Sequence, residues 1–181
     1  VPAQSGIWAN KGGRMYTYVS TMTISNCIFD DNYGGSGGAI KDVGSPITYS
    51  NTVFANNEAR NHGGVLDKSG GNTSEFVNCL FYNNTANRTS TKMGGALQLG
   101  SCTAGTTIIN CTFYNNKAGQ GGAIRAYDSP VTAKNTIFYD NYDDGSKTAA
   151  GADIFDAGAS TRFDLTNCLM QLASSSYTSG N

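Results

Sequence analysis

The amino-acid sequence predicts an all-β fold, a right-handed parallel β-helix solenoid of about six coils. Three observations support this prediction. One unit recurs every 25 to 32 residues, its apolar residues alternate with polar ones, and Asn residues and Gly-Gly pairs mark its corners. A recurrence of this length, with several short strand-like segments in each unit, is typical of stacked coils.

Each unit begins with the pattern Asn-x-x-Phe-x-x-Asn and ends with Gly-Gly, a small residue and a branched apolar residue. The first Asn of the six units is Asn26, Asn51, Asn78, Asn110, Asn135 and Asn167. The fifth Gly-Gly pair is degraded, and the sixth unit has Met170 in place of Phe. We therefore expect one domain over residues 1–181, with coils that begin near residues 26, 51, 78, 110, 135 and 167.

The residues before the first Asn alternate in polarity. The residues two places before it are Ile24, Tyr49, Phe76, Ile108, Ala133 and Leu165, and those three places before it are Thr23, Thr48, Glu75, Thr107, Thr132 and Asp164. Alternation with a period of two predicts a strand with one buried face. Apolar spacings of three and four are not sustained anywhere, so helical repeats fit poorly.

Stacked coils place like residues above one another, about 4.8 Å apart. Phe29, Phe54, Phe81, Phe113 and Phe138 are expected to form an internal stack that Met170 closes, and Ile40, Leu66, Leu97, Ile124 and Ile154 to line the interior. An Asn at a corner tolerates a left-handed backbone and can bond to the Asn one coil away. The Gly pair predicts a corner without room for a Cβ atom. Extra residues are expected mainly between the second Asn and the Gly pair.

The composition excludes several function classes. Charged residues make up 14% of the chain and the net charge is -1, which gives no basic surface for nucleic acid or for an anionic membrane. No apolar run approaches the roughly twenty residues of a membrane span.

Four of the five Cys residues share one position, directly after the first Asn: Cys27, Cys79, Cys111 and Cys168. Thr52 and Thr136 occupy the same position, so a ladder of packed thiols is favoured over a Cys79–Cys111 disulfide, which stays open. Cys102 falls outside the register and is expected to be an exposed thiol. The absence of a Cys-x-x-Cys motif argues against zinc.

The pairing of Phe-x-x-Asn with Gly-Gly-Ala-Ile or Gly-Gly-Ala-Leu resembles the repeats of chlamydial polymorphic outer-membrane proteins and of adhesin-like β-helix proteins. The matching pairs are Phe29/Asn32, Phe54/Asn57, Phe81/Asn84, Phe113/Asn116 and Phe138/Asn141. The resemblance implies a secreted or cell-surface location and an adhesive role, and it implies no catalytic residues.

Two groups of outward residues are candidate sites. Tyr82, Tyr114 and Tyr139 follow the Phe on successive coils, and such a stripe either binds sugar rings or a protein partner or reinforces coil stacking. Asp140, Asp143 and Asp144 offer oxygen ligands for Ca²⁺, but their spacing matches no calcium loop, so a solvated turn is favoured. No other cofactor is expected. His62, the single histidine, lies in a corner where nothing positions a catalytic triad.

We expect an extracellular or cell-surface structural or adhesive module without catalysis. Its partners would be host or matrix glycans or proteins, or copies of itself. Neither end shows a polar cap, so we expect either a part of a longer solenoid or a subunit whose open coil ends stack head to tail into a fibre. A polysaccharide-binding or lyase-like β-helix is the alternative, and it requires an acidic groove with Lys or Arg on adjacent coils, whereas Lys41, Arg125 and Lys134 look scattered. An ice-binding row of Thr is weaker, since Glu75 and Asp164 interrupt it.

Overall fold

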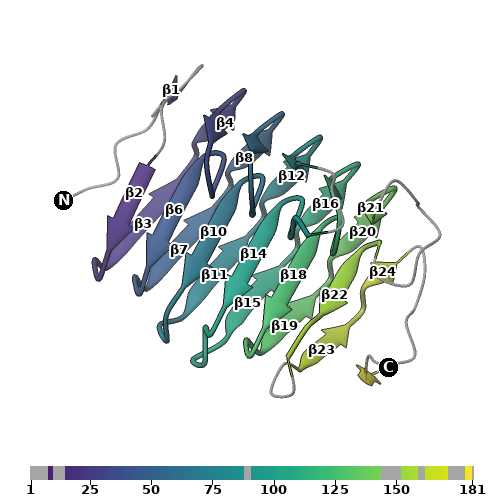
Figure 1. Ribbon diagram of the computed structural model, residues 1–181. Helices are drawn as coiled ribbons and strands as arrows, with labels where there is room; N and C mark the ends of the chain where they lie inside the picture. Colours follow the sequence, from purple (N-terminus) through teal and green to yellow (C-terminus); the bar gives the residue numbers. More distant parts are fainter. Residues whose placement is uncertain are drawn as a thin grey trace.

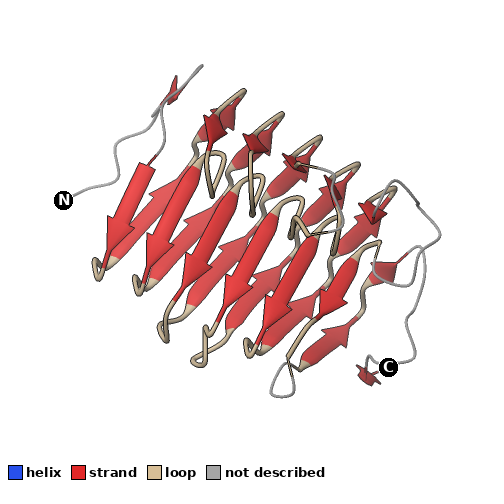
Figure 2. Ribbon diagram, viewed as in Figure 1, coloured by secondary structure: helices blue, strands red, loops and turns tan. Residues whose placement is uncertain are grey.

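The computed structural model confirms an all-β parallel solenoid (Figures 1 and 2). It describes residues 15–87, 91–143, 152–158 and 162–170, and the backbone of residues 8–9 and 178–180. All the described elements are strands, and they form four parallel sheets that run along the solenoid. The smallest sheet has five strands, so the described residues make five complete coils, and residues 163–170 belong to a sixth.

Each coil visits the four sheets in the order C, A, D and B. Sheet A contains β1 (Trp8–Ala9), β4 (Ile28–Asp30), β8 (Val53–Ala55), β12 (Leu80–Tyr82), β16 (Thr112–Tyr114), β20 (Ile137–Tyr139) and β24 (Leu169–Met170). Sheet B contains β2 (Met15–Tyr18), β6 (Ile40–Val43), β10 (Leu66–Ser69), β14 (Leu97–Gly100), β18 (Ile124–Tyr127) and β22 (Ile154–Asp156). Sheet C contains β3 (Met22–Ser25), β7 (Ile47–Ser50), β11 (Ser74–Val77), β15 (Thr106–Ile109), β19 (Val131–Lys134), β23 (Phe163–Thr166) and β25 (Thr178–Gly180). Sheet D contains β5 (Tyr33–Gly34), β9 (Glu58–Ala59), β13 (Thr85–Ala86), β17 (Lys117–Ala118) and β21 (Tyr142–Asp143).

The predicted Phe stack is confirmed as the centre of the core. Successive rings from Phe29 to Phe138 lie 5.2, 4.8, 4.4 and 5.0 Å apart and are nearly parallel. Met170 is paired with Phe138 and packs against the core, as expected. A second stack, of Tyr49 on Phe76 at 4.6 Å, meets the first edge-on. Burial of these large rings stabilises the stacking of the coils.

The Asn residues form two kinds of ladder. The first Asn of each unit has a positive φ, between 49° and 54°. From Asn78 onward, its Nδ2 donates to Oδ1 of the first Asn on the preceding coil, as from Asn78 to Asn51 at 3.2 Å. The second Asn is buried. Asn57, for example, donates from Nδ2 to Asn84 Oδ1 at 3.0 Å and to the Phe29 carbonyl at 2.9 Å. Its side chain therefore satisfies backbone groups that the corner would leave without partners.

The degraded fifth Gly-Gly pair has a structural explanation. Asn141 is the last Asn of the buried ladder, and its Nδ2 donates to Asp153 Oδ1 at 2.8 Å. Asp153 follows Ala152 in the altered tetrapeptide and is 4% exposed. On the earlier coils, the ladder Asn donates this hydrogen bond to the Asn of the following coil. Asp153 takes the place of that acceptor for Asn141.

The Gly pairs mark the predicted tight corner between sheets D and B. A Cβ on Gly95 would lie 1.9 Å from the Gly122 carbonyl oxygen and 2.5 Å from the Lys117 nitrogen. Gly94, the first of the pair, has a φ of +67°, which an L-residue with a side chain rarely adopts. Extra residues are not confined to this corner, however. The corner between sheets B and C also varies in length, over residues 44–46, 70–73, 101–105 and 128–130.

The Cys position selects a small hydrogen-bond donor rather than a disulfide. The Cys27 thiol and the Thr52 hydroxyl each donate to the carbonyl two residues earlier, at 3.2 and 2.9 Å, and all five thiols are free. The hydrogen bond with the Cys79 side chain, and then burial, raise the pKa of Cys111, which keeps it a thiol.

The expectation of an exposed Cys102 is wrong. Cys102 is fully buried, and its backbone N–H donates to Ser129 Oγ at 2.9 Å. It occupies a second small-donor position, at the corner between sheets B and C, where Ser129 stands on the next coil. Burial raises the pKa of the Cys102 thiol. The variable length of that corner hides this register in the sequence.

Candidate functional site

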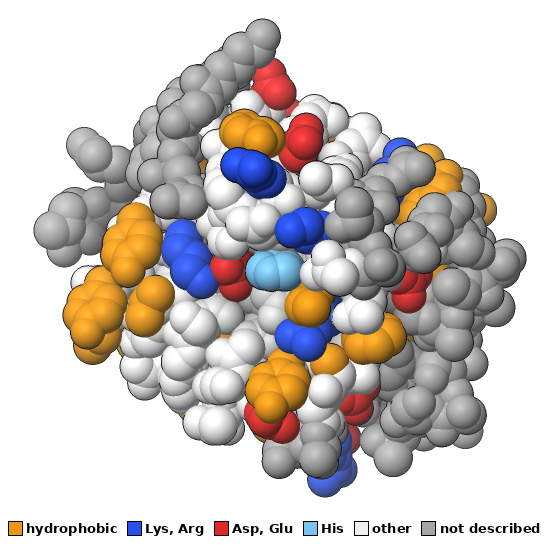
Figure 3. All heavy atoms as spheres, viewed as in Figure 1, with side chains coloured by type: hydrophobic (Ala, Val, Ile, Leu, Met, Phe, Trp, Pro, Cys, Tyr) orange, Lys and Arg blue, Asp and Glu red, His pale blue; other side chains and the backbone are white. Residues whose placement is uncertain are grey.

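The outer face of sheet B carries a row of polar and charged side chains. The strand register pairs Lys41 with Asp67, Asp67 with Gln98, and Gln98 with Arg125, on four successive coils. The expectation that Lys41 and Arg125 are scattered is therefore wrong, because the two belong to one row. Lys134 lies on sheet C. Figure 3 views this face and shows Lys and Arg side chains gathered around the single histidine.

The contacts within this row leave several polar atoms unused. Lys41 Nζ lies 2.8 Å from Asp67 Oδ2, and both side chains are partly exposed. Gln98 is 7% exposed, and its Oε1 atom has no hydrogen-bond partner among the described residues. The same holds for Nε of Arg125, whose guanidinium lies 5.5 Å from the centre of the Tyr127 ring. Buried polar atoms without partners are unusual and favour a site that meets a ligand.

His62 lies at the edge of this row, in the corner that leads into β10. A bridge pairs His62 with Met93 on the next coil, and the buried Nδ1 atom has no partner among the described residues. Burial lowers the pKa of His62; Asp67 raises it, and Lys92, Arg125 and Lys41 lower it further. The imidazole is consequently neutral at pH 7, where its surroundings are already cationic.

His62 is expected to make the fold more sensitive to mild acid. Since its folded-state pKa is below the unfolded value of 6.5, the unfolded chain takes up a proton first. The stability that depends on neutral His62 is thus present above pH 6.5 and is lost as the pH falls below it. Urea unfolding between about pH 8 and pH 5 should show a weaker pH dependence for His62→Gln than for the wild type. Equal slopes for the two proteins would contradict this assignment.

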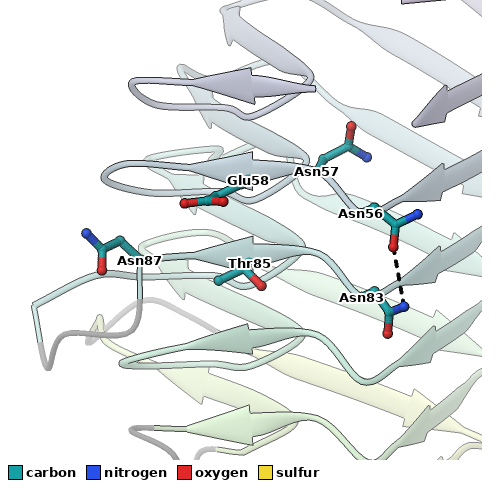
Figure 4. Close-up of a pocket in the computed structure, with 6 residues that line it drawn as sticks. All are labelled: Asn56, Asn57, Glu58, Asn83, Thr85 and Asn87. Atoms are coloured by element: carbon teal, nitrogen blue, oxygen red, sulfur yellow. Dashed lines mark hydrogen bonds between the residues drawn. The ribbon is translucent and has the colours of Figure 1, made fainter. Parts of the chain in front are cut away.

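A second candidate is a hollow between two coils at the corner of sheets A and D (Figure 4). Its volume is about 400 Å³, and its lining residues are Asn56, Asn57, Glu58, Asn83, Thr85 and Asn87. Asn83 Nδ2 donates to Asn56 Oδ1 at 3.3 Å, and Asn57 belongs to the buried ladder. Most of these amides serve the solenoid itself, so the hollow has few free groups.

The predicted tyrosine stripe lies on the outer face of sheet A. Tyr82, Tyr114 and Tyr139 are paired in register. The exposed rings of Tyr114 and Tyr139 stack on each other, with their centres 6.2 Å apart. Stacking turns ring faces toward neighbouring coils, which is the arrangement that reinforces the coils. A binding role for the stripe stays a prediction.

The predicted calcium ligands are only partly described. Asp140 has a φ of +60° and continues the corner row of Asn56, Asn83 and Asn115. Asp143 lies in β21 and is 9% exposed, and Asp144 lies outside the described residues. Within the described ranges, no group of three or more His, Cys, Asp or Glu side chains could hold a metal ion. Calcium binding stays a prediction.

The Thr row is present on the outer face of sheet C. Thr23, Thr48, Thr107 and Thr132 are in register there, and Glu75 and Asp164 interrupt them. Arg162 forms an ion pair with Asp164 at 2.9 Å.

A search for long apolar helices that could cross a bilayer found none in the part of the chain that the structure describes.

Comparison with known proteins gives one match. Residues 110–127 match the Chlamydia polymorphic membrane protein repeat. They span the fourth unit, from Asn110 through Phe113 and Asn116 to the Gly-Gly pair and β18. Neither the curated proteins nor the solved structures gave a significant match. The chain is a parallel β-solenoid repeat protein, and one of its repeats is similar to that of the Chlamydia polymorphic membrane proteins.

Proposed function

We propose that the protein is a surface-associated, non-catalytic adhesive module that binds anionic glycans through the outer face of sheet B. The surface location rests on the similarity of residues 110–127 to the polymorphic membrane protein repeat. The binding face rests on one observation, the row that includes Lys41, Gln98 and Arg125 with its buried polar atoms that lack partners.

The charges and hydrogen-bonding groups of this face suit an acidic sugar. Lys41, Lys92 and Arg125 outnumber Asp67, although the whole chain has a net charge of -1. A guanidinium binds a carboxylate or a sulfate through two parallel hydrogen bonds. Gln98 Oε1 can accept a hydrogen bond from a sugar hydroxyl. On the same sheet, Tyr16 in β2 and Tyr127 in β18 are 60% and 44% exposed and offer apolar ring surfaces.

The experiment is a binding assay with a sulfated glycan and a polyuronate, with a neutral glucan as the control ligand. Arg125→Gln is expected to weaken binding to the acidic ligands by about tenfold or more. Lys134→Gln removes an exposed cation from sheet C and is expected to have little effect. Wild-type binding should weaken with added salt and strengthen as His62 gains a proton at low pH.

Three outcomes contradict the proposal or change it. Equal binding to neutral and acidic glycans excludes the electrostatic face, and equal losses for Arg125→Gln and Lys134→Gln exclude this location. Cleavage of the acidic ligand would favour the lyase alternative, which also requires basic residues on adjacent coils. Against that alternative, Asp67 is the carboxylate of the row and already forms an ion pair with Lys41.

End-to-end assembly is a second candidate, supported by the sheet edges. Among the described strands, β2 in sheet B and β5 in sheet D are each paired on one side. A strand edge with free backbone groups can pair with another chain. Light scattering over a wide concentration range should then show a mass that grows with concentration, whereas a constant monomer mass excludes a fibre.

A further inference from the structure

The interior of sheet B holds a buried pair of opposite charges that the repeat does not require. The third residue of each strand from β2 to β18 points inward, and these residues are Thr17, Asp42, Lys68, Leu99 and Ala126. The Lys68 and Asp42 side chains are 0% and 1% exposed. An ammonium group and a carboxylate this far from water are costly unless they compensate each other closely.

The two oxygens of Asp42 have different surroundings. Lys68 Nζ lies 2.5 Å from Oδ2 and also 2.5 Å from the Ser45 carbonyl oxygen. Oδ1 accepts hydrogen bonds from the Thr17 hydroxyl at 2.6 Å and from the Ser45 backbone N–H at 3.2 Å. One oxygen is thus held by two donors, and the other faces the amine.

We propose that Lys68 and Asp42 condense into an isopeptide bond, which joins β6 and β10 covalently inside the solenoid. The inference is independent of the glycan-binding proposal, because it concerns the interior of sheet B and no ligand takes part.

The chemistry needs no reagent beyond the two side chains. A proton first passes from the ammonium group to Oδ2 along their hydrogen bond, which leaves a neutral amine and a neutral carboxylic acid. A low-dielectric interior favours these neutral forms over separated charges. The lone pair of Nζ then attacks Cγ, and negative charge develops on Oδ1.

The Asp42 surroundings suit this step. The Thr17 hydroxyl and the Ser45 N–H are already directed at Oδ1, so they stabilise the developing charge as an oxyanion hole does. Oδ2 takes a second proton from the nitrogen and leaves as water. One C–N bond forms, one C–O bond breaks, and nothing is oxidised or reduced. The packed core holds the amine beside the carboxyl, which replaces a bimolecular encounter.

The chain contains a matched internal control. Lys41 and Asp67 lie on the same two strands, one residue earlier, and form an ion pair at 2.8 Å on the outer face. Their side chains are 23% and 12% exposed, so they keep contact with water. The same two chemical groups are expected to remain an ion pair there.

The test is the intact mass of the denatured wild-type protein, followed by sequencing of its proteolytic fragments. The expected mass is lower than the sequence mass by one molecule of water, and a branched fragment should join the peptides of Asp42 and Lys68. Lys41 and Asp67 should be unmodified. Asp42→Asn should lose one molecule of ammonia instead, because the side-chain amide nitrogen takes the place of Oδ2 as the leaving group.

Lys68→Met is expected to show the full sequence mass. If that variant fails to fold, Lys68→Arg serves the same purpose, since it keeps the charge and a guanidinium does not condense in this way. Thr17→Val keeps both reacting groups and should lower the cross-linked fraction. A wild type of full sequence mass would overturn the proposal, as would a loss of water that persists in the Lys68 variants, which would indicate a cyclic imide at an aspartate.

Discussion

Lys68→Met is expected to lower the free energy of unfolding by about 3–5 kcal/mol, one of the two largest effects in this chain. The substitution keeps the volume of the side chain but removes the charge and the donor that compensate Asp42, which is fully buried. Tyr49 adds to the cost of leaving Asp42 without compensation, because its hydroxyl is also buried nearby without a partner among the described residues. Burial, and then the charge of Asp42, raise the Tyr49 pKa. Urea unfolding followed by circular dichroism measures the loss.

Two further variants show what the loss consists of. Lys41→Met removes the same residue type from the neighbouring ion pair at the surface and should cost less than about 1 kcal/mol. The double variant Asp42→Leu/Lys68→Met removes both buried charges and should recover part of the stability. The part that is not recovered measures the covalent link between β6 and β10. A Lys68→Met protein as stable as the wild type would show that the pair does not hold the first coils together.

The features predicted correctly are those that recur in every unit. The Phe stack and the Asn rows could be placed because five copies give the same spacing relative to the first Asn, and the apolar residues after the Gly pairs could be placed because they keep the same spacing from the pair. Parallel stacking then converts equal spacing into contact. The Asn141–Asp153 contact could not be predicted this way, because an Asp takes the position of the acceptor Asn in one coil alone.

The sequence also contains a signal for the buried Asp42–Lys68 pair and for the outer row of sheet B. This signal is hidden when residues are counted from the first Asn of each unit. In sheet B the inward Ile40 and Leu66 follow the Gly pairs, so the residues two places later, Asp42 and Lys68, also point inward. The residues between them, Lys41 and Asp67, point outward by the same alternation. Counting from the Gly pair instead of the Asn therefore yields both opposite-charge pairs.

Other parts of the site depend on contacts that no local pattern specifies. The approach of His62 to Lys92 and Arg125 depends on how the corner of variable length folds over sheet B. Corner residues differ in number from coil to coil, so their side chains have no fixed register. The same uncertainty hid the buried position of Cys102.

Phe81→Ala is the other substitution with a large expected effect, a loss of about 3–5 kcal/mol. Phe81 is fully buried at the middle of the stack, 4.8 Å from Phe54, 4.4 Å from Phe113 and 5.5 Å from Phe76. Removal of the ring leaves a cavity between backbones whose spacing is fixed by the sheet hydrogen bonds, so the neighbouring coils cannot close it. Thermal unfolding should show a clearly lower Tm.

Tyr82→Ala is the matched control, because Tyr82 is the next residue on the same strand and points outward. It should cost about 1 kcal/mol or less, as expected for a partly exposed side chain. Since each coil contacts its neighbours alone, a weakened third coil should also divide the solenoid into parts that unfold separately. The Phe81→Ala transition is then expected to be broader than that of Tyr82→Ala, with a smaller dependence of the unfolding free energy on urea. Equal losses in the two variants would mean that the inner stack contributes no more to stability than the outer surface does.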